Sequence, residues 1–416
     1  MDFERRLSEL VVSPGLGLEA GQEVLLTAHV DHLPLVREIA AALYRAGAVE
    51  VLTLLADDEL TLARFRHGGE EAAGHAPAWL YRALAEEMSG GRLARVSVAG
   101  EDPGLFKEVP PEKLALATQA HARAYEPVLK QIASFATNWT IVPYPSRGWA
   151  AAVFPDLPGA EARERLKRAL ALALRLDAPD PAAEWRRRAD ELAARARWLS
   201  ERRFRALHFL GPGTDLVVGL AEGHRWKGGW ATTRAGKRIL PNIPTEEVFT
   251  MPHRERVEGV ASASMPFSLS GVLVRGLRVR FERGVAVEVE AEEGLEAVEA
   301  LLATDEGARR LGEVALVPAD SGVRRAGLLF LNTLLDENAA SHIAFGQAYG
   351  ENLEGFEELG EEERRSRGMN QSRVHQDWMI GSEEVDVFGV GDDGRRVPLL
   401  KGGRWAFQVG TGGPRP

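Results

Sequence analysis

The chain has 416 residues, of which 45% are hydrophobic and 27% are charged. Because one hydrophobic core usually stops growing near ~250–300 residues, this length predicts about two globular domains. A net charge of −10 repels phosphate backbones and argues against a nucleic-acid-binding protein. The chain has no cysteine, which excludes disulfides, thiolate metal ligands and cysteine nucleophiles. Any bound metal must therefore be held by oxygen and nitrogen atoms.

The start of the chain shows no signal for export or membrane insertion. Positions 2, 4, 5 and 6 are charged, and no apolar leader segment follows them. Nowhere does the chain contain the run of about 18 or more apolar residues that a membrane-spanning helix needs. We therefore expect a cytoplasmic protein that does not bind membranes.

Stretches typical of strands alternate with helical stretches through the first part of the chain. The predicted strands are 23–30, 49–56, 94–99 and 139–144, and the predicted helices are 34–46, 78–88 and 114–135. This alternation is typical of a parallel sheet with helices packed on it. We predict an N-terminal α/β domain over residues 1–205.

Two helices are predicted over residues 161–205, because the prolines of segment 177–181 interrupt the helical pattern. Apolar residues recur every three or four positions from Trp185 to Leu199, which predicts one apolar face on the second helix. Its arginines are interpreted as a solvent-exposed face, because opposite charges such as Arg187 and Glu191 are interleaved there.

Short strands and turns dominate the rest of the chain. The predicted strands are 207–210, 216–220, 271–281, 285–291, 378–380, 385–390 and 396–400, with turns at 211–213 and 392–394. We predict an α+β C-terminal domain over residues 206–416, with antiparallel pairing, that carries the catalytic and metal-binding residues.

Several common catalytic motifs do not occur in this sequence. We find no His-Glu-x-x-His, no Gly-x-Ser-x-Gly and no phosphate-binding loop ending in Gly-Lys-Ser/Thr. His29 and His32 follow each other closely at the end of the first predicted strand, but such a pair alone is a weak indication of a metal site.

Side chains suited to a metal site with oxygen and nitrogen ligands collect in the C-terminal half. They are Glu246, Glu247, Glu313, His342, Tyr349, His375 and Asp377. On a strand, His375 and Asp377 would project from the same face, so one ion could bind both. Each residue also has an ordinary explanation: Glu313 as a surface carboxylate, for example, and His342 as a hydrogen-bonded histidine in the core. The residues alone support no more than a metal-dependent hydrolase.

Three segments carry a resemblance to a known family. Residues 241–250 (PNIPTEEVFT), 341–346 (SHIAFG) and 375–381 (HQDWMIG) resemble the aminopeptidase T/aminopeptidase S family, the M29 metallopeptidases. Residues 139–145 and 213–220 resemble further segments of the same family. The resemblance thus extends along the whole chain.

The resemblance implies a metal-dependent aminopeptidase that releases N-terminal amino acids from peptides with a free N-terminus. Its metal ligands correspond to Glu247, Glu313, His342, His375 and Asp377, and its active-site tyrosine to Tyr349. Two divalent ions (zinc, cobalt or magnesium) would activate a water between them. The resemblance also implies a homodimer.

The roles of three further residues are hypotheses. By analogy with two-metal aminopeptidases that use adjacent glutamates, Glu246 is expected to act as the general base. Asp336 or Glu337, near His342, could bind the substrate amine, and neither is assigned that role.

Two alternatives remain open at this point. The same metals could serve another dinuclear hydrolase, such as a carboxypeptidase, dipeptidase or deacetylase. The chain could also be a two-lobed, non-catalytic protein that binds a small ligand or a metal.

Overall fold

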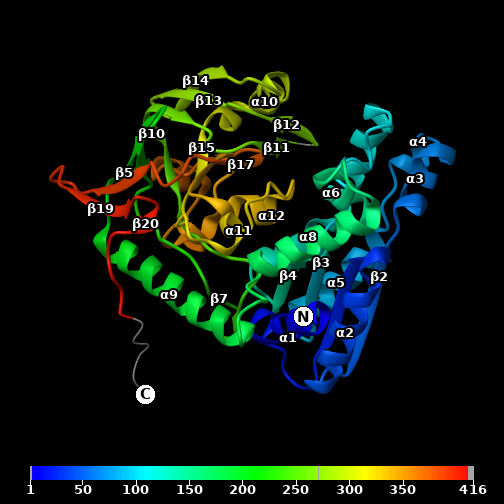
Figure 1. The fold of residues 1–416 in the computed structure, drawn as a ribbon. Coiled ribbons are helices and arrows are strands. Elements are labelled where there is room, and N and C mark those ends of the chain that lie inside the picture. Colours follow the sequence, from blue (N-terminus) through cyan, green and yellow to red (C-terminus); the bar gives the residue numbers. More distant parts are fainter. Residues whose placement is uncertain (1, 270, 411–416) are drawn as a thin grey trace. The chain divides into compact units, whose positions relative to one another are not determined.

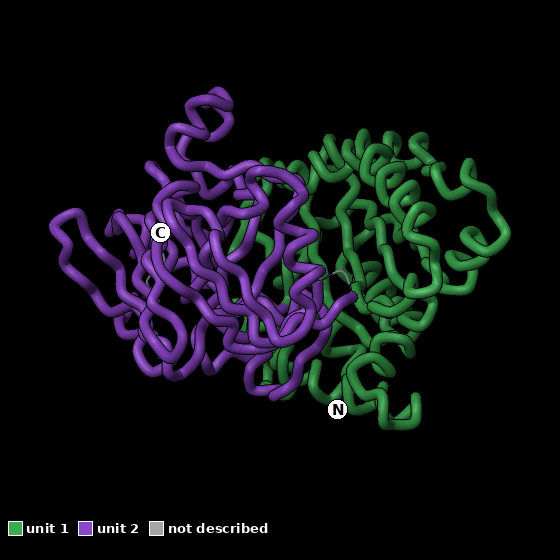
Figure 2. Tube along the Cα trace, turned by 90° about the horizontal axis from the view of Figure 1, so that it is seen from above, with its two compact units in different colours: residues 1–186, 230–243 green, residues 187–229, 244–416 purple. Residues whose placement is uncertain are grey.

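The computed structural model describes residues 2–269 and 271–410 (Figure 1). The chain divides into two compact units (Figure 2). Unit 1 extends to residue 186 and includes 230–243, and unit 2 comprises 187–229 and the residues from 244 onwards. These limits differ in two respects from the expected domains 1–205 and 206–416. The division falls inside helix α9 (Pro181–Arg202), and segment 230–243 returns to unit 1.

Segment 230–243 belongs to unit 1 because it adds to the edge of the parallel sheet. Its residue Asn242 forms a parallel bridge with Ile141, and Ile141 N donates to Pro241 O at 2.7 Å. The sequence pattern gave no sign of this return, because the segment contains only the short strands β7 (Ala231–Thr232) and β8 (Arg238–Ile239).

Unit 1 is built on a four-stranded parallel sheet with the strand order β2-β1-β3-β4. Its strands are β1 (Glu23–His29), β2 (Glu50–Ala56), β3 (Leu93–Ala99) and β4 (Trp139–Pro143). Its helices are α1 (Phe3–Leu10), α2 (Leu33–Arg45), α3 (Asp58–His67), α4 (Glu70–Ala73), α5 (Ala78–Ser89), α6 (Pro111–Ala133), α7 (Arg147–Val153) and α8 (Gly159–Ala173). The predicted α/β fold of this region is confirmed.

Unit 2 contains a large antiparallel sheet with the strand order β14-β13-β10-β6-β5-β18-β19-β20. Its strands are β5 (Ala206–Gly211), β6 (Thr214–Leu220), β10 (Pro252–Ser262), β13 (Arg278–Glu282), β14 (Val285–Glu290), β18 (Asp386–Val390), β19 (Arg396–Lys401) and β20 (Arg404–Trp405). A separate hairpin pairs β11 (Phe267–Leu269) with β12 (Val272–Val274).

A second antiparallel sheet of unit 2 has the order β17-β16-β15-β9. Its strands are β9 (Val248–Thr250), β15 (Leu311–Leu316), β16 (His342–Gly346) and β17 (His375–Met379). Short helices connect the strands of the unit: α10 (Leu295–Leu302), α11 (Gly322–Arg325), α12 (Thr333–Asp336) and α13 (Glu361–Ser366). The predicted α+β character is confirmed. Among the described residues, no helix combines the length and apolarity needed to cross a membrane.

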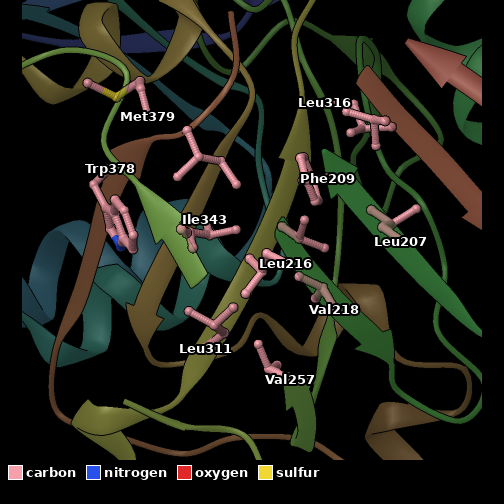
Figure 3. Close-up of a cluster of buried hydrophobic side chains, with 14 of the residues drawn as sticks. Leu207, Phe209, Leu216, Val218, Val257, Leu311, Leu316, Ile343, Trp378 and Met379 are labelled. Atoms are coloured by element: carbon pink, nitrogen blue, oxygen red, sulfur yellow. The ribbon is translucent and has the colours of Figure 1, made fainter. Parts of the chain in front are cut away.

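The two sheets of unit 2 share one hydrophobic core (Figure 3). Leu216 and Val218 contribute to it from the large sheet, and Leu311, Ile343 and Trp378 contribute from the smaller one. All five side chains are fully buried. Since successive residues of a strand project to opposite faces, the smaller sheet is left with a second face for other side chains.

Helix α9 has the predicted apolar face, but its arginines are not all exposed. The side chains of Trp185 and Leu199 are fully buried. The side chains of Arg188 and Arg195 are only 13% and 14% exposed, so their interpretation as part of a solvated face is wrong. Arg187, by contrast, lies at the surface and pairs with Glu191 one turn further along the helix.

The shared core generates a prediction about stability. Leu216→Ala should lower the free energy of unfolding by about 2–5 kcal/mol, because it opens a cavity at a fully buried position. Leu210→Ala is the matched control: Leu210 lies on the paired strand β5 but is 42% exposed, and its truncation should cost under about 1 kcal/mol. Urea unfolding followed by tryptophan fluorescence measures both. Equal losses would contradict this account of the core.

Candidate metal centre

The pairing of three strands brings the predicted metal ligands together. Ala344, in the central strand β16, lies directly opposite Glu313 on β15 and Asp377 on β17. Residues two apart on a strand project from the same face, so His342 shares a face with Ala344, and His375 shares one with Asp377. Because the side chain of Ala344 is only a methyl group, it leaves room on this face for the longer side chains around it. These are Glu313, His342, His375 and Asp377.

A β-bulge in β15 turns Glu313 towards this face. Leu311 pairs with Phe345, and Glu313 pairs with Ala344, so Gly312 is an extra residue without a partner of its own. Without the bulge, Leu311 and Glu313 would share a face, whereas Leu311 is part of the hydrophobic core. A Cβ atom at Gly312 would lie 2.2 Å from the carbonyl oxygen of Gln347, so only glycine fits this bulge.

The ligand atoms form two groups that share one residue. His342 Nε2 lies 3.1 Å from Glu247 Oε2 and 3.6 Å from Glu313 Oε1. His375 Nε2 lies 3.4 Å from Asp377 Oδ1 and 3.7 Å from Glu313 Oε2. Two donors that bind one ion at ~2.1 Å each are at most ~4.2 Å apart, so these atoms already have ligand spacing. Glu313 belongs to both groups.

Both histidines present Nε2 to the carboxylates for a structural reason. His342 Nδ1 is 3.1 Å from the carbonyl oxygen of Ala340, and His375 Nδ1 is 2.8 Å from that of Gln347. A carbonyl can only accept, so each Nδ1 carries the hydrogen and donates it. In the neutral ring the lone pair is then on Nε2, which is the usual arrangement of metal-binding histidines. The donor set therefore fits a divalent cation.

Burial and the neighbouring charges raise the pKa of several groups in the cluster, although the contact with His375 outweighs burial and lowers the pKa of Asp377. Burial, together with the charges of Asp377 and Glu247, raises the pKa of Glu313 to about 7, against an opposing contact with His342. Burial lowers the pKa of His375, but Asp377 and Glu313 outweigh it and raise the value to about 9. The chain thus takes up protons at positions where a divalent cation could balance the same negative charge.

Glu337 lies beside the cluster, whereas the carboxylate of Asp336 is hydrogen-bonded to backbone N–H groups. Burial and the charges of Asp377 and Glu247 raise the pKa of Glu337 well above its usual range. Asp336 accepts hydrogen bonds from the backbone N–H groups of Phe330 at 2.8 Å and Asn332 at 3.0 Å. The sequence offered these two neighbours equally for amine recognition. Both line the pocket beside Asp377, but the Asp336 carboxylate is already hydrogen-bonded to backbone N–H groups.

A small pocket, partly open to solvent, adjoins the cluster. Its wall includes Asp377, Glu337 and Gln376, together with the apolar side chains of Phe267 and Met379. A molecule bound to the cluster could place a side chain of mixed polarity there.

Tyr349 reaches the cluster because the chain turns sharply after β16. Gly346 has a φ of +96°, and a Cβ atom there would lie 2.0 Å from the carbonyl oxygen of Val374. The ring of Tyr349 then packs on the ring of His375 with centroids 4.8 Å apart. Although Tyr349 is 43% exposed, loss of hydration and the nearby carboxylates, led by Glu313, raise its pKa. Its hydroxyl is protonated and can donate.

Three residues considered in the sequence analysis, Glu246, His29 and His32, do not belong to the ligand groups. Glu246 is fully buried, but its carboxylate forms an ion pair with Arg188 and accepts a hydrogen bond from Gly322 N at 2.9 Å. This placement gives no support to its expected role as a base. In unit 1, His29 Nε2 lies 3.2 Å from Asp58, and neither His29 nor His32 joins a group of three closely spaced ligands among the described residues.

The raised pKa values predict how the stability of the metal-free protein depends on pH. Glu313 and His375 have folded pKa values of about 7 and about 9, above their ordinary values of 4.5 and 6.5. Each group therefore contributes stability that is present below its unfolded pKa and is lost as the pH rises through its folded pKa. The unfolding temperature of chelator-treated protein should fall from about pH 5 towards pH 9.

A divalent cation should reverse this loss, and its effect should grow with pH because it competes with fewer protons. Thermal unfolding with and without Co²⁺ at several pH values between these limits tests the prediction. A cation-induced shift that stays constant or shrinks as the pH rises would show that the cation binds elsewhere.

Comparison with known proteins gives the same picture. A family model described as thermophilic metalloprotease (M29) matches residues 4–405. Aminopeptidase T of Thermus thermophilus is 55% identical over 400 residues, which cover 96% of this chain and 97% of the relative. Aminopeptidase 2 of Geobacillus stearothermophilus is 40% identical, over 97% of this chain and 98% of its own.

A solved structure, wild-type AmpT from Thermus thermophilus, superimposes with a TM-score of 0.92 at 53% sequence identity, covering 97% of this chain and 99% of the other. The fold and the sequence thus agree over almost the full length. The chain belongs to the thermophilic metalloprotease family, M29, and is a metal-dependent peptide hydrolase.

Proposed function

We propose that this metalloprotease is an aminopeptidase that works with two divalent ions. The observation that carries the proposal is the pair of ligand groups that share Glu313. The relatives support the substrate class, since those at 55% and 40% identity are named aminopeptidases. Zinc, cobalt or magnesium would suit these oxygen and nitrogen ligands.

The proposed ligand assignment follows the two groups. Glu247, Glu313 and His342 would hold one ion, and Glu313, His375 and Asp377 would hold the other. When bound, the ions supply an activated water and polarise the scissile carbonyl.

Tyr349 is the proposed donor to the carbonyl oxygen of the substrate. A tyrosine hydroxyl is protonated at neutral pH, and the raised pKa of Tyr349 keeps it so at alkaline pH as well. The packing of its ring on His375 limits where the hydroxyl can move. A donor held in place in this way stabilises the negative charge that develops on the oxygen during attack.

The proton released during attack needs an acceptor. The sequence-based hypothesis names Glu246, whose carboxylate is paired with Arg188. Glu337 is better placed, because it lines the same pocket as Asp377. Burial, and after it the charges of Asp377 and Glu247, raises its pKa. We propose Glu337 as the group that accepts this proton or binds the substrate amine.

Several further expectations belong to the same proposal. Peptides with a free N-terminus are the proposed substrates, and the pocket lined by Phe267, Met379 and Glu337 marks where the N-terminal residue would lie. The family resemblance implies a homodimer, and the absence of cysteine favours a cytoplasmic location. The net charge of −10 favours a protein without nucleic-acid partners.

The first test is hydrolysis of leucine p-nitroanilide by metal-stripped protein, before and after zinc, cobalt or magnesium is added. We expect cleavage only after a metal is restored, and only of the substrate with a free amine. The N-acetylated substrate is the parallel control. Metal-dependent cleavage of both substrates would contradict an aminopeptidase and favour a broader metallohydrolase, and release of C-terminal residues from peptides would indicate a carboxypeptidase.

A second test concerns the proposed oxyanion donor. Tyr349→Phe should lower kcat by on the order of a hundredfold or more, because one preorganised donor is worth ~2.7–4 kcal/mol in the transition state. Metal content should be unchanged, since phenylalanine retains the ring that packs on His375. Tyr125→Phe, in helix α6 of unit 1, is the control and should keep full activity. A rise in KM with kcat unchanged would mean that the hydroxyl contributes only to substrate binding and not specifically to the transition state.

A further inference from the structure

We infer that Glu246 is a positioning residue: with Arg188 and Asn338 it forms a buried network that holds the backbone on either side of the metal cluster. The inference rests on the proposed metal site. It assigns Arg188 and Asn338, which lie far apart in the sequence, to the support of Glu247 and Glu337.

Two carboxylates at the cluster, Glu247 and Glu337, do not lie in the middle of a strand, so strand pairing does not fix their positions. Glu313, His342 and Asp377 are fixed by ladder hydrogen bonds and cross-strand register. Glu247, however, precedes β9, whose pairing with β15 begins at Val248. Glu337 lies on a single turn between α12 and β16. Such residues need other contacts to hold their direction.

The first part of the network is a buried ion pair. Arg188, on α9, contacts Glu246 Oε2, and the two side chains are 13% and 0% exposed. Glu246 Oε1 accepts a second hydrogen bond, from Gly322 N at the start of α11. Both carboxylate oxygens therefore contact the protein, and Glu247 is directed the other way, towards His342.

The second part connects the neighbours of the two carboxylates directly. Glu246 N donates to Asn338 Oδ1 at 2.6 Å, and Asn338 Nδ2 donates to Leu334 O at 3.0 Å. Asn338 is 1% exposed and adjacent to Glu337. One hydrogen bond thus joins the residue beside Glu247 to the residue beside Glu337, and the ion pair with Arg188 anchors both segments to a long helix.

A positioning role and a base role predict different measurements. A base must contact the water or the amine that reacts, and its loss leaves the affinity for the metals unchanged. A positioning residue controls where Glu247 points, so its loss weakens metal binding, typically by about 10–100-fold for supports of this kind.

The experiment is calorimetric titration of metal-free protein with Co²⁺ for the wild type, Glu246→Gln, Arg188→Met and the double variant. We expect each single variant to lose about 10–100-fold in affinity. The double variant should lose less than the product of the two single losses, because it leaves no unpaired buried charge. Unchanged affinity in Glu246→Gln would overturn the inference.

The pH dependence of kcat/KM at saturating metal separates the two roles further. With a positioning residue, Glu246→Gln keeps the shape of the wild-type profile at a lower level. Loss of the acidic limb of the profile, with metal affinity intact, would establish Glu246 as the base and would also overturn the inference.

Arg187→Met is the matched control, since Arg187 precedes Arg188 on the same helix but pairs with Glu191 at the surface. Its metal affinity should equal that of the wild type. If Glu246→Gln does not fold, Arg188→Lys and Asn338→Ala test the same network, and intact affinity in both would exclude it. Because the titration uses no substrate, its result stands even if the proposed peptidase activity fails.

Discussion

The register of β16 against β15 and β17 is the constraint on which the rest of the site depends. Val314, Ile343 and Trp378 fill the core on one face of this sheet, and Glu313 and His342 lie on the other. A shift of one residue would exchange the two faces, turning the charged side chains into the hydrophobic core and the apolar ones away from it. The burial of core side chains therefore does more than stabilise unit 2, because it also holds mutually repelling carboxylates at ligand distance.

This arrangement stores unfavourable electrostatic energy in the metal-free protein. The pKa of Glu313 is raised to about 7 because its carboxylate is buried beside others of the same charge. The surrounding structure resists relaxation at two kinds of position. Strand pairing fixes Glu313 and Asp377, whereas the backbone beside Glu247 is held through a buried arginine and an asparagine. Unfavourable electrostatic energy of this kind is typical of functional sites, where a bound ligand of opposite charge offsets it.

The sequence predicted the parallel sheet of unit 1 well, because β1 to β4 are separate apolar runs divided by helices. Strands β15 and β16 were missed as strands, since every residue in them is buried and no alternation of polar and apolar residues is left to detect. The metal-ligand hypothesis came mainly from family resemblance, and its residues do meet in space. The sequence could not predict which way the two adjacent glutamates point, because nothing in it distinguishes Glu246 from Glu247. The residue that pairs with Glu246 is Arg188, and its helix was interpreted from the sequence as having solvent-exposed arginines.

The clustered side chains come from positions 247 to 377, on strands and turns that are distant in the chain. No short stretch of the unfolded polypeptide carries more than two of the five proposed ligands, so the proposed metal site would form only after β9, β15, β16 and β17 have paired. The bulge at Gly312 adds a further condition for forming the site, since β15 must pair with β16 so that Gly312 has no partner. Only molecules with correctly paired strands would then bind the metal. The amount of metal bound per chain would therefore measure the correctly folded fraction of a preparation before any substrate is added.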